Sequence, residues 1–222
     1  MARPRTPKGR ARLVNERLLT EFPGTARDLC ALSFETPFQL LAATILSAQC
    51  TDVQVNLVTP ALFAAFPDAA SLARAQPEVV EELIRTTGFF RAKTRSLIGM
   101  AAAVQDRFGG VVPTELSDLV TLPGVGRKTG NVLRSVAFDL PGLPVDTHVL
   151  RLSRRLGLTD ALRGPEQEDA VKVEHLLNTM VPAAERGGFS LRLILHGRAT
   201  CVARRPACDR CLLADFCPSF AL

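Results

Sequence analysis

Apolar residues recur at helical spacing along almost the whole chain, and this periodicity limits the fold more than any other feature of the sequence. The first two apolar stripes consist of Leu13, Leu18, Leu19 and Phe22, and of Phe38, Leu41, Ile45 and Leu46. Similar spacing predicts further helices over residues 53–66, 71–86, 93–108, 114–120, 128–138, 147–156, 165–181 and 189–200. Turn-forming pairs such as Pro23-Gly24 and Pro141-Gly142 separate these segments. Because no convincing period-two run appears, the sequence predicts an all-α protein with short connections.

The composition is that of a folded domain with an anionic partner. Hydrophobic residues make up 47% and charged residues 22% of the 222 residues, unlike the composition of disordered chains. No apolar run approaches the roughly 18 residues that a membrane span needs, and the first ten residues lack the apolar stretch of a secretory signal. We therefore expect an intracellular protein without membrane contact. The net charge of +5 suggests a polyanion such as nucleic acid as partner.

The first ten residues are basic and rich in turn formers. They contain Arg3, Arg5, Lys8 and Arg10, interleaved with Pro4, Pro7 and Gly9. Such a segment has too few apolar residues to pack into a core. We expect residues 1–10 to form a flexible basic arm that contacts phosphates at most non-specifically.

Four of the six cysteines lie within seventeen residues near the C-terminus: Cys201, Cys208, Cys211 and Cys217. This C-x6-C-x2-C-x5-C pattern, in a chain without signs of secretion, predicts a metal site instead of disulfides. Four thiolates this close together suit either one tetrahedral zinc ion or one iron–sulfur cluster. We expect the other two, Cys30 and Cys50, to be ordinary buried thiols.

A glycine-rich turn, LPGVGRK, lies between two predicted helices at residues 122–128. Gly124 and Gly126 permit positive φ and leave the backbone free of Cβ atoms. The amide N–H groups at the start of the next helix can then approach a phosphate directly. With Val125 and Arg127 these glycines are candidate DNA-binding residues, although an ordinary turn between helices shows the same short pattern.

The whole segment LPGVGRKTGNVLRSVAFDLPGLPVDTHVLRLSRRLGL, residues 122–158, resembles the helix-hairpin-helix and following loop of the endonuclease III family of DNA glycosylases. The resemblance extends from about Leu13 to Cys217. It implies that Lys128, after the second hairpin glycine, attacks the sugar. It also implies that Asp146, in the VDTH segment, supports this attack.

The expected chemistry explains why a lysine and an aspartate are needed. Cleavage of an N-glycosidic bond leaves positive charge on the sugar, which a carboxylate stabilises and a neutral amine captures as a Schiff base. A helix N-terminus, the adjacent Arg127 and partial removal from water would all favour a neutral Lys128. From spacing alone, a solvated lysine and an N-cap aspartate are the better interpretations, and only the family pattern favours catalytic roles. We expect Asp146 to stay ionised and His148 to be structural or near a phosphate.

The 6-2-5 spacing of the four C-terminal cysteines matches the iron–sulfur loop of the same family. The resemblance therefore implies a [4Fe–4S] cluster with a structural role on Cys201, Cys208, Cys211 and Cys217. Arg204 and Arg205 lie between the first two cysteines, on the loop that the cluster would hold. They are candidate contacts to DNA backbone phosphates.

Two further segments resemble loops with which the family supports an opened duplex, since extruding a base costs a few kcal/mol. Gln49 in LSAQCTD has the position of a glutamine that enters the vacated space. A polar residue at a helix C-terminus is the plainer alternative. Phe89 in TGFFR has the position of an apolar wedge, where relatives often carry leucine. A buried core position is its alternative.

The resemblance implies a helix-hairpin-helix glycosylase fold: a six-helix barrel domain over residues 30–140, an iron–sulfur domain of residues 11–29 and 141–222, and a cleft between them. The implied function is DNA base excision repair by a glycosylase that is also an abasic-site lyase. The glycosylase is a hydrolase, and its expected substrates are damaged pyrimidines of the oxidised kind. The implied partner is double-stranded DNA containing damaged bases or abasic sites, bound by a monomer in the nucleoid.

Three alternatives remain in view. An adenine-mismatch glycosylase of the same superfamily fits less well, because that branch lacks lysine at the position of Lys128. A mismatch thymine or uracil glycosylase and a non-enzymatic helix-hairpin-helix DNA-binding module are harder to separate from the first interpretation by sequence.

Overall fold

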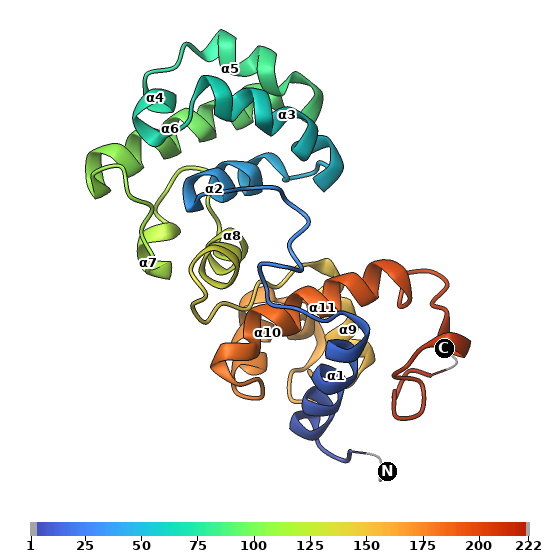
Figure 1. Cartoon of the computed structure of the whole chain (residues 1–222). Helices are drawn as coiled ribbons and strands as arrows, with labels where there is room; N and C mark the ends of the chain where they lie inside the picture. The colour runs from blue at the N-terminus through green and yellow to red at the C-terminus, as the bar shows by residue number, and fades with distance from the viewer. Residues whose placement is uncertain (1–3, 221–222) are drawn as a thin grey trace. The chain divides into compact units, whose positions relative to one another are not determined.

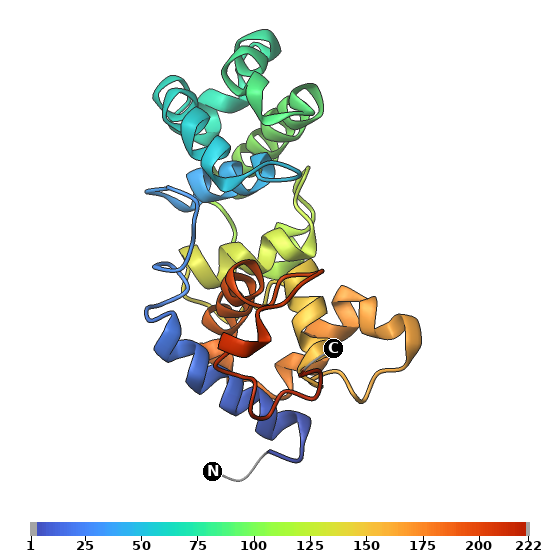
Figure 2. The ribbon, with the colours of Figure 1, turned by 90° about the vertical axis from the view of Figure 1, so that its right-hand side faces the viewer.

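The computed structural model describes residues 4–220. Within this range the chain forms helices and connections and no strand, which confirms the all-α prediction. The chain divides into two compact units (Figures 1 and 2). Unit 1 contains both ends of the chain, Met1–Leu29 and Asp139–Leu222, and unit 2 is the continuous segment Cys30–Phe138. None of the helices between residues 4 and 220 is long and apolar enough to cross a membrane.

Unit 2 is a bundle in which the longest helix, α6, contacts three others, α2, α4 and α5. Leu97 and Met100 of α6 are fully buried, as are Leu41 of α2 and Leu72 of α4. Each such side chain contributes roughly 1.5–3 kcal/mol when fully removed from water. The elements of this unit are α2 (Pro37–Leu46), α3 (Asp52–Ala65), α4 (Ala69–Ala73), α5 (Pro77–Ile84), the 3-10 turn η1 (Arg85–Thr87), α6 (Phe90–Phe108), α7 (Leu116–Leu119), α8 (Arg127–Val132) and the π-helical extension η2 (Leu133–Ala137).

One expected helix of unit 2 is divided. The prediction of a single helix over residues 71–86 is wrong, because α4 ends at Ala73 and α5 begins at Pro77. Proline lacks the N–H that a continuing helix needs, and its ring clashes with the carbonyl four residues earlier. As the first residue of α5, by contrast, Pro77 has a favourable position.

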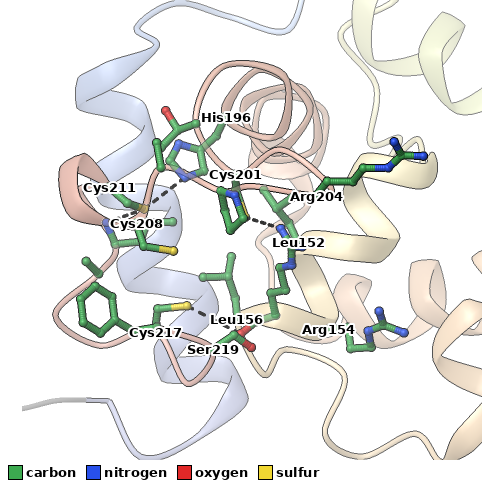
Figure 3. Close-up of a pocket in the computed structure, with 17 residues that line it drawn as sticks. Leu152, Arg154, Leu156, His196, Cys201, Arg204, Cys208, Cys211, Cys217 and Ser219 are labelled. Atoms are coloured by element: carbon green, nitrogen blue, oxygen red, sulfur yellow. Dashed lines mark hydrogen bonds between the residues drawn. The ribbon is translucent and has the colours of Figure 1, made fainter. Parts of the chain in front are cut away.

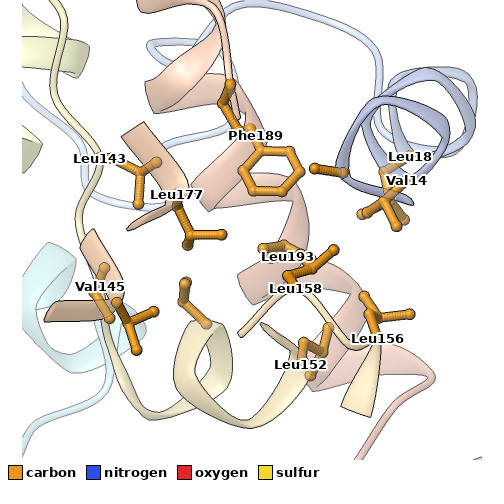
Figure 4. Packing of buried hydrophobic residues seen from close by; sticks show 14 of the residues in the cluster. Val14, Leu18, Leu143, Val145, Leu152, Leu156, Leu158, Leu177, Phe189 and Leu193 are labelled. Carbon is orange, nitrogen blue, oxygen red and sulfur yellow. The ribbon is translucent and has the colours of Figure 1, made fainter. Parts of the chain in front are cut away.

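Unit 1 packs helices from both ends of the chain around one core (Figure 4). Phe189 and Leu193 of α11 are fully buried and meet Leu18 of α1 and Leu152 of α9 in this core. The C-terminal segment joins the same core through Leu213 and Phe216. The elements are α1 (Pro7–Glu21), α9 (Thr147–Arg155), η3 (Gly164–Glu168), α10 (Ala170–Asn178), η4 (Ala183–Glu185), α11 (Arg186–Ala199) and η5 (Cys208–Arg210).

The expected flexible arm over residues 1–10 is wrong for its second half. Helix α1 begins at Pro7, and the Thr6 side chain caps it by accepting from the Gly9 amide at 3.1 Å. Arg10 is buried, donates to the Gly157 carbonyl and pairs with Asp160. The local signal was a threonine N-cap followed by proline, which favours a helix start even in a basic segment. Residues 1–3 lie outside the described range.

Candidate active site and cluster loop

The hairpin between α7 and α8 depends on Gly124. Its φ of +77° lies in the left-handed region, and a Cβ at this position would lie 2.8 Å from the Cβ of Ser96. The Val125 amide donates to the Leu122 carbonyl at 3.1 Å, and the Val125 side chain is buried. The turn is thus fixed from inside by a buried side chain, a backbone hydrogen bond and a residue without Cβ.

Gly126 differs from Gly124 in what surrounds it. It is the N-cap residue of α8, with φ −91°, and as a glycine it has no side chain with which to cap this helix end. A Cβ at Gly126 would meet no atom within 4 Å. The first amides of α8 therefore lie beneath an open surface, an arrangement that suits a phosphate.

Lys128 is the second residue of α8 and is exposed. The expectation that it lies partly out of water is therefore wrong for the protein alone. Arg127, which begins the helix, is half-buried. The position at a helix start, where the N–H dipoles disfavour a positive charge, agrees with the expectation.

Asp146 is the N-cap residue of α9. Its Oδ1 accepts from the amides of His148 at 2.8 Å and Val149 at 2.9 Å. Both bonds use the same oxygen, so capping does not engage Oδ2. The N-cap that spacing alone predicted is present, and its two hydrogen bonds go to Oδ1. Asp146 belongs to unit 1 and Lys128 to unit 2, so their pairing stays a prediction.

His148 makes a structural contact. Burial lowers the pKa of its imidazole. The Asp146 carboxylate acts in the opposite direction and raises this pKa, but the effect of burial is larger. Its Nδ1 lies 3.0 Å from Nη2 of Arg151, which also donates to the carbonyls of Gly197 at 3.0 Å and Cys201 at 3.1 Å. His148 is thus part of the packing between α9 and the end of α11.

Gln49 and Phe89 share an unusual backbone conformation. Among the described residues only three non-glycine positions have positive φ, and two of them are Gln49 at 52° and Phe89 at 48°. Both side chains are exposed, and Phe89 keeps 69% of its surface in water. The alternative of a core position for Phe89 is therefore excluded. Left-handed backbone on a non-glycine residue costs about 1–3 kcal/mol and concentrates at functional sites.

Phe90 differs from Phe89 although the two are adjacent. Its ring is half-buried and lies beneath the guanidinium groups of Arg85, at 5.8 Å, and Arg91, at 5.6 Å. The sequence showed only a pair of phenylalanines. In the structure Phe90 packs against the two arginines, and Phe89 is exposed to solvent.

The four C-terminal cysteines line one cavity of about 330 Å³ (Figure 3). In the described part of the chain, no three His, Cys, Asp or Glu side chains are gathered closely enough to hold a single metal ion. Four thiols that line one cavity are the set of ligands that a [4Fe–4S] cluster takes. Burial raises the pKa of the Cys211 and Cys217 thiols. Positive charge from a bound metal group would be needed to hold them as thiolates.

Two elements supply polar contacts to these sulfur atoms. Nη1 of Arg155, at the end of α9, donates to Cys201 Sγ at 3.3 Å. Nε2 of His196, in α11, lies 3.5 Å from Cys211 Sγ, while its Nδ1 lies 3.2 Å from the Glu21 carboxylate. Such contacts outside the ligands orient them and tune the group they hold.

The loop between the cysteines is held from two sides. Arg155 donates to the carbonyls of Val202 at 2.8 Å and Ala203 at 2.6 Å. From α1, Arg17 donates to Asp215 at 2.8 Å and lies 5.1 Å from the Phe216 ring centroid. Arg204 and Arg205 follow Ala203 and are exposed, and the Arg204 guanidinium points away from the cysteines (Figure 3).

Sequence reasoning missed Arg155, Arg17 and the buried Lys93, which donates to the Thr87 carbonyl at 2.7 Å. For Arg155 a weak signal existed, because Arg151 and Arg155 are spaced i, i+4 and lie on one face of a helix. Lys93 and Arg17 gave no signal, since nothing distinguishes them in sequence from solvated helix cations. Cys30 and Cys50, expected to be buried, are partly exposed.

Two family models match the chain. The model of HhH-GPD superfamily base excision DNA repair proteins matches residues 42–182, which include the hairpin, Lys128 and Asp146. The model of the iron-sulfur binding domain of endonuclease III matches residues 201–217, from the first of the four cysteines to the last. Fold and hairpin thus define a helix-hairpin-helix protein of the base excision repair class.

Individual relatives narrow this class. The endonuclease III of Synechocystis sp. is 49% identical over 199 residues, 89% of this chain and 87% of that protein. The chain belongs to the endonuclease III family. A solved non-covalent endonuclease III–DNA complex has a TM-score of 0.85 at 37% identity, covering 96% of this chain and 95% of the other. A trapped endonuclease III–DNA covalent intermediate also has a TM-score of 0.85 at 37% identity, covering 96% of both chains.

Proposed function

We propose that this protein is a DNA base excision repair glycosylase with abasic-site lyase activity, and that Lys128 forms a Schiff base with the sugar. The observation that carries the proposal is the lysine at the second position of the helix after the hairpin, in a chain of the endonuclease III family. The substrate is double-stranded DNA with a damaged base, which we take to be an oxidised pyrimidine, or with an abasic site. One copy of the chain carries both Lys128 and Asp146, so a monomer suffices, acting inside the cell on chromosomal DNA.

Docking uses the backbone of the hairpin. The amides that follow Gly126 meet a phosphate, and no side chain there reads the base sequence. Bound DNA covers the exposed Lys128 and removes it from water, which the protein alone does not do. This desolvation adds to the helix dipole in favouring the neutral amine that attacks C1′.

Lys128 and Asp146 then divide the chemistry. The Lys128 Nζ bonds to C1′ as the bond between C1′ and the base breaks, and the base leaves with the electron pair of that bond. Asp146 stabilises the positive charge that develops on the sugar through Oδ2, the oxygen that its two capping bonds do not use. The C1′–O4′ bond then breaks as the nitrogen lone pair forms the C1′=N bond, and O4′ takes up a proton, so the opened sugar is a Schiff base with Lys128. The Schiff base acidifies C2′, and loss of a proton there expels the 3′ phosphate by β-elimination.

Gln49 and Phe89 act before the chemistry. Both stand exposed on left-handed backbone, Gln49 in the turn before α3 and Phe89 in the turn before α6. We propose that Phe89 enters the base stack as a wedge and that Gln49 occupies the space left by the extruded base. Unstacking costs a few kcal/mol, part of which these contacts would return.

The four cysteines are proposed to hold a [4Fe–4S] cluster, in agreement with the matched iron-sulfur domain and with the shared cavity. The cluster supplies a covalent anchor for four points of the C-terminal loop. It thereby presents Arg204 and Arg205 at a fixed place, where they contact phosphates without reading bases.

The test of the nucleophile is borohydride trapping, because reduction of a Schiff base links protein and DNA covalently. Lys128→Ala should keep DNA binding, since the hairpin backbone is unchanged, and should lose trapping, base release and strand nicking together. Lys172→Ala removes a lysine from unit 1 and serves as the charge control. Undiminished trapping in Lys128→Ala would falsify the assignment and leave a DNA-binding module or a different nucleophile.

Asp146 needs a variant that separates capping from catalysis. Asn is as good an N-cap as Asp, so Asp146→Asn should melt like the parent and yet turn over much more slowly. If its single-turnover rate equals that of the parent, Asp146 is only an N-cap. Oligonucleotides with oxidised pyrimidines, G·T and G·U mismatches and abasic sites separate the oxidised-base activity from a mismatch glycosylase.

A further inference from the structure

Lys93 is a buried lysine that contacts the turn carrying Phe89 twice. Only 5% of its surface is exposed. Its Nζ donates to the Thr87 carbonyl at 2.7 Å, and its backbone amide donates to the Phe89 carbonyl at 3.1 Å. One residue in the first turn of α6 thus holds the chain on both sides of Gly88.

The turn that Lys93 holds is strained. Gly88 has φ +69° and Phe89 has φ +48°, so two consecutive residues lie in the left-handed half of conformational space. An aromatic residue in this conformation needs compensating contacts to persist. The Phe89 side chain supplies few, because it is exposed, and a Cβ at Gly88 would meet no atom within 4 Å. The contacts that offset the cost of this conformation are therefore hydrogen bonds of the backbone on either side of Gly88.

Thr87 is the residue on the N-terminal side of the turn that makes these stabilising hydrogen bonds. It is fully buried, and its hydroxyl donates to the Ile84 carbonyl at 2.8 Å, which closes the 3-10 turn η1. Its carbonyl accepts from Lys93. A lysine held under a surface loop at the cost of burial is otherwise hard to explain, since burial disfavours the charged form.

The segment that carries Gln49 is connected to the same turn. Nε2 of Gln54 in α3 donates to the Thr86 hydroxyl at 2.8 Å. Burial lowers the pKa of the Lys93 ammonium group, and Cys50, the residue after Gln49, acts in the opposite direction. The segment that follows Gln49 is therefore connected to the Phe89 turn through Gln54 and Thr86.

We infer that Lys93 is a positioning residue that fixes the Phe89 turn in its exposed, left-handed conformation and so prepares Phe89 for entry into the base stack. The inference rests on the proposed wedge function of Phe89. Lys93 does not touch the substrate. Its effect on the reaction passes through the Thr87 carbonyl and ends at Phe89.

The experiment compares Lys93→Met, Phe89→Ala and the double variant in single-turnover reactions on a duplex with a damaged base and on one with a preformed abasic site. Methionine keeps the apolar stem and removes the donor. Lys93→Met should slow base removal by about tenfold and abasic-site nicking by less than about twofold, because an abasic site has no base to unstack. In the Phe89→Ala background, Lys93→Met should cost less than about a further twofold, since contacts acting through one residue are not additive.

A second readout does not depend on DNA. Hydrogen exchange of the amides of residues 88–95 should be faster in Lys93→Met than in the parent, whereas Lys172→Met, which removes an exposed lysine of unit 1, should leave it unchanged. Unchanged exchange in Lys93→Met overturns the inference, as do equal losses on both substrates or fully additive losses in the double variant. If Phe89→Ala affects both substrates equally, the wedge function fails, while faster exchange in Lys93→Met would still support the clamp.

Discussion

At the scale of the residue, the two hairpin glycines differ in backbone conformation and in surroundings. Gly124 has a left-handed backbone and no room for a Cβ beside Ser96. Gly126 has an ordinary φ of −91° and open space around it. No described residue within 4 Å demands glycine at Gly126, and we expect the absence of a Cβ there to matter only when DNA approaches the hairpin.

Alanine at each glycine tests these differences. Gly124→Ala should destabilise unit 2, because a Cβ in left-handed backbone costs about 1–2 kcal/mol before any clash. Gly126→Ala should change stability by less than about 0.5 kcal/mol, as surface substitutions do, and should weaken DNA binding, because its Cβ would stand where a phosphate approaches. Thermal unfolding and DNA titration of the two variants measure both effects. Parental DNA affinity in Gly126→Ala would exclude the hairpin amides from the interface.

At the scale of the element, the cluster loop depends on helices far away in the sequence. Arg17 in α1 reaches Asp215 and Phe216 across nearly two hundred residues of chain, and Arg155 at the end of α9 holds Val202 and Ala203. The loop has little regular structure of its own, apart from the short turn η5. Its order therefore comes from the two helices and from the group that the cysteines hold.

Arg17→Ala should loosen this loop without touching a cysteine. Removing a partly exposed ion pair, a hydrogen bond and a cation–π contact costs about 1 kcal/mol, or roughly 2–4 °C in melting temperature for a chain of this length. The purified parent should be straw-brown with about four irons per chain, and Arg17→Ala should lose iron faster under a chelator. Arg12→Ala, on the same helix and in an exposed ion pair with Glu16, is the matched control. Equal iron loss in the two variants would contradict the role of Arg17.

At the scale of the whole molecule, the net charge of +5 is modest, so DNA affinity should come from a few placed contacts. Arg204 and Arg205 are exposed on the cluster loop. Their joint replacement by alanine should weaken binding to damaged and undamaged duplex alike, because phosphate contacts carry no sequence information. The slope of log affinity against log salt should become shallower by about 0.9 for each phosphate that the variant no longer neutralises.

A control for this prediction removes two arginines elsewhere. Arg12 and Arg163 are also exposed, and their joint replacement by alanine lowers the net charge by the same amount. If both double variants show the same salt slope, general charge accounts for the effect and the cluster loop has no special part in it.

The sequence by itself determined the features that depend on neighbouring residues. Helical periodicity and turn pairs correctly predicted an all-α chain, because a helix buries one stripe at a local period. The cysteine spacing and the hairpin motif pointed to the endonuclease III family, which the comparisons confirm. The same local reasoning missed the helix start at Thr6-Pro7, since the basic composition of the segment outweighed a capping signal that was present.

Only the tertiary structure decided what depends on distant residues. Arg10 is buried because Gly157 and Asp160 accept its hydrogen bonds, and these partners lie about 150 positions away. The left-handed backbone of Phe89 and the burial of Lys93 follow from packing between α6 and η1, and no residue pattern encodes them. Burial, backbone strain and hydrogen-bond partners are set by contacts between residues that are far apart in the sequence. The identity of a residue therefore predicts which chemistry its side chain can do, and only its surroundings in the fold decide whether the side chain can do it.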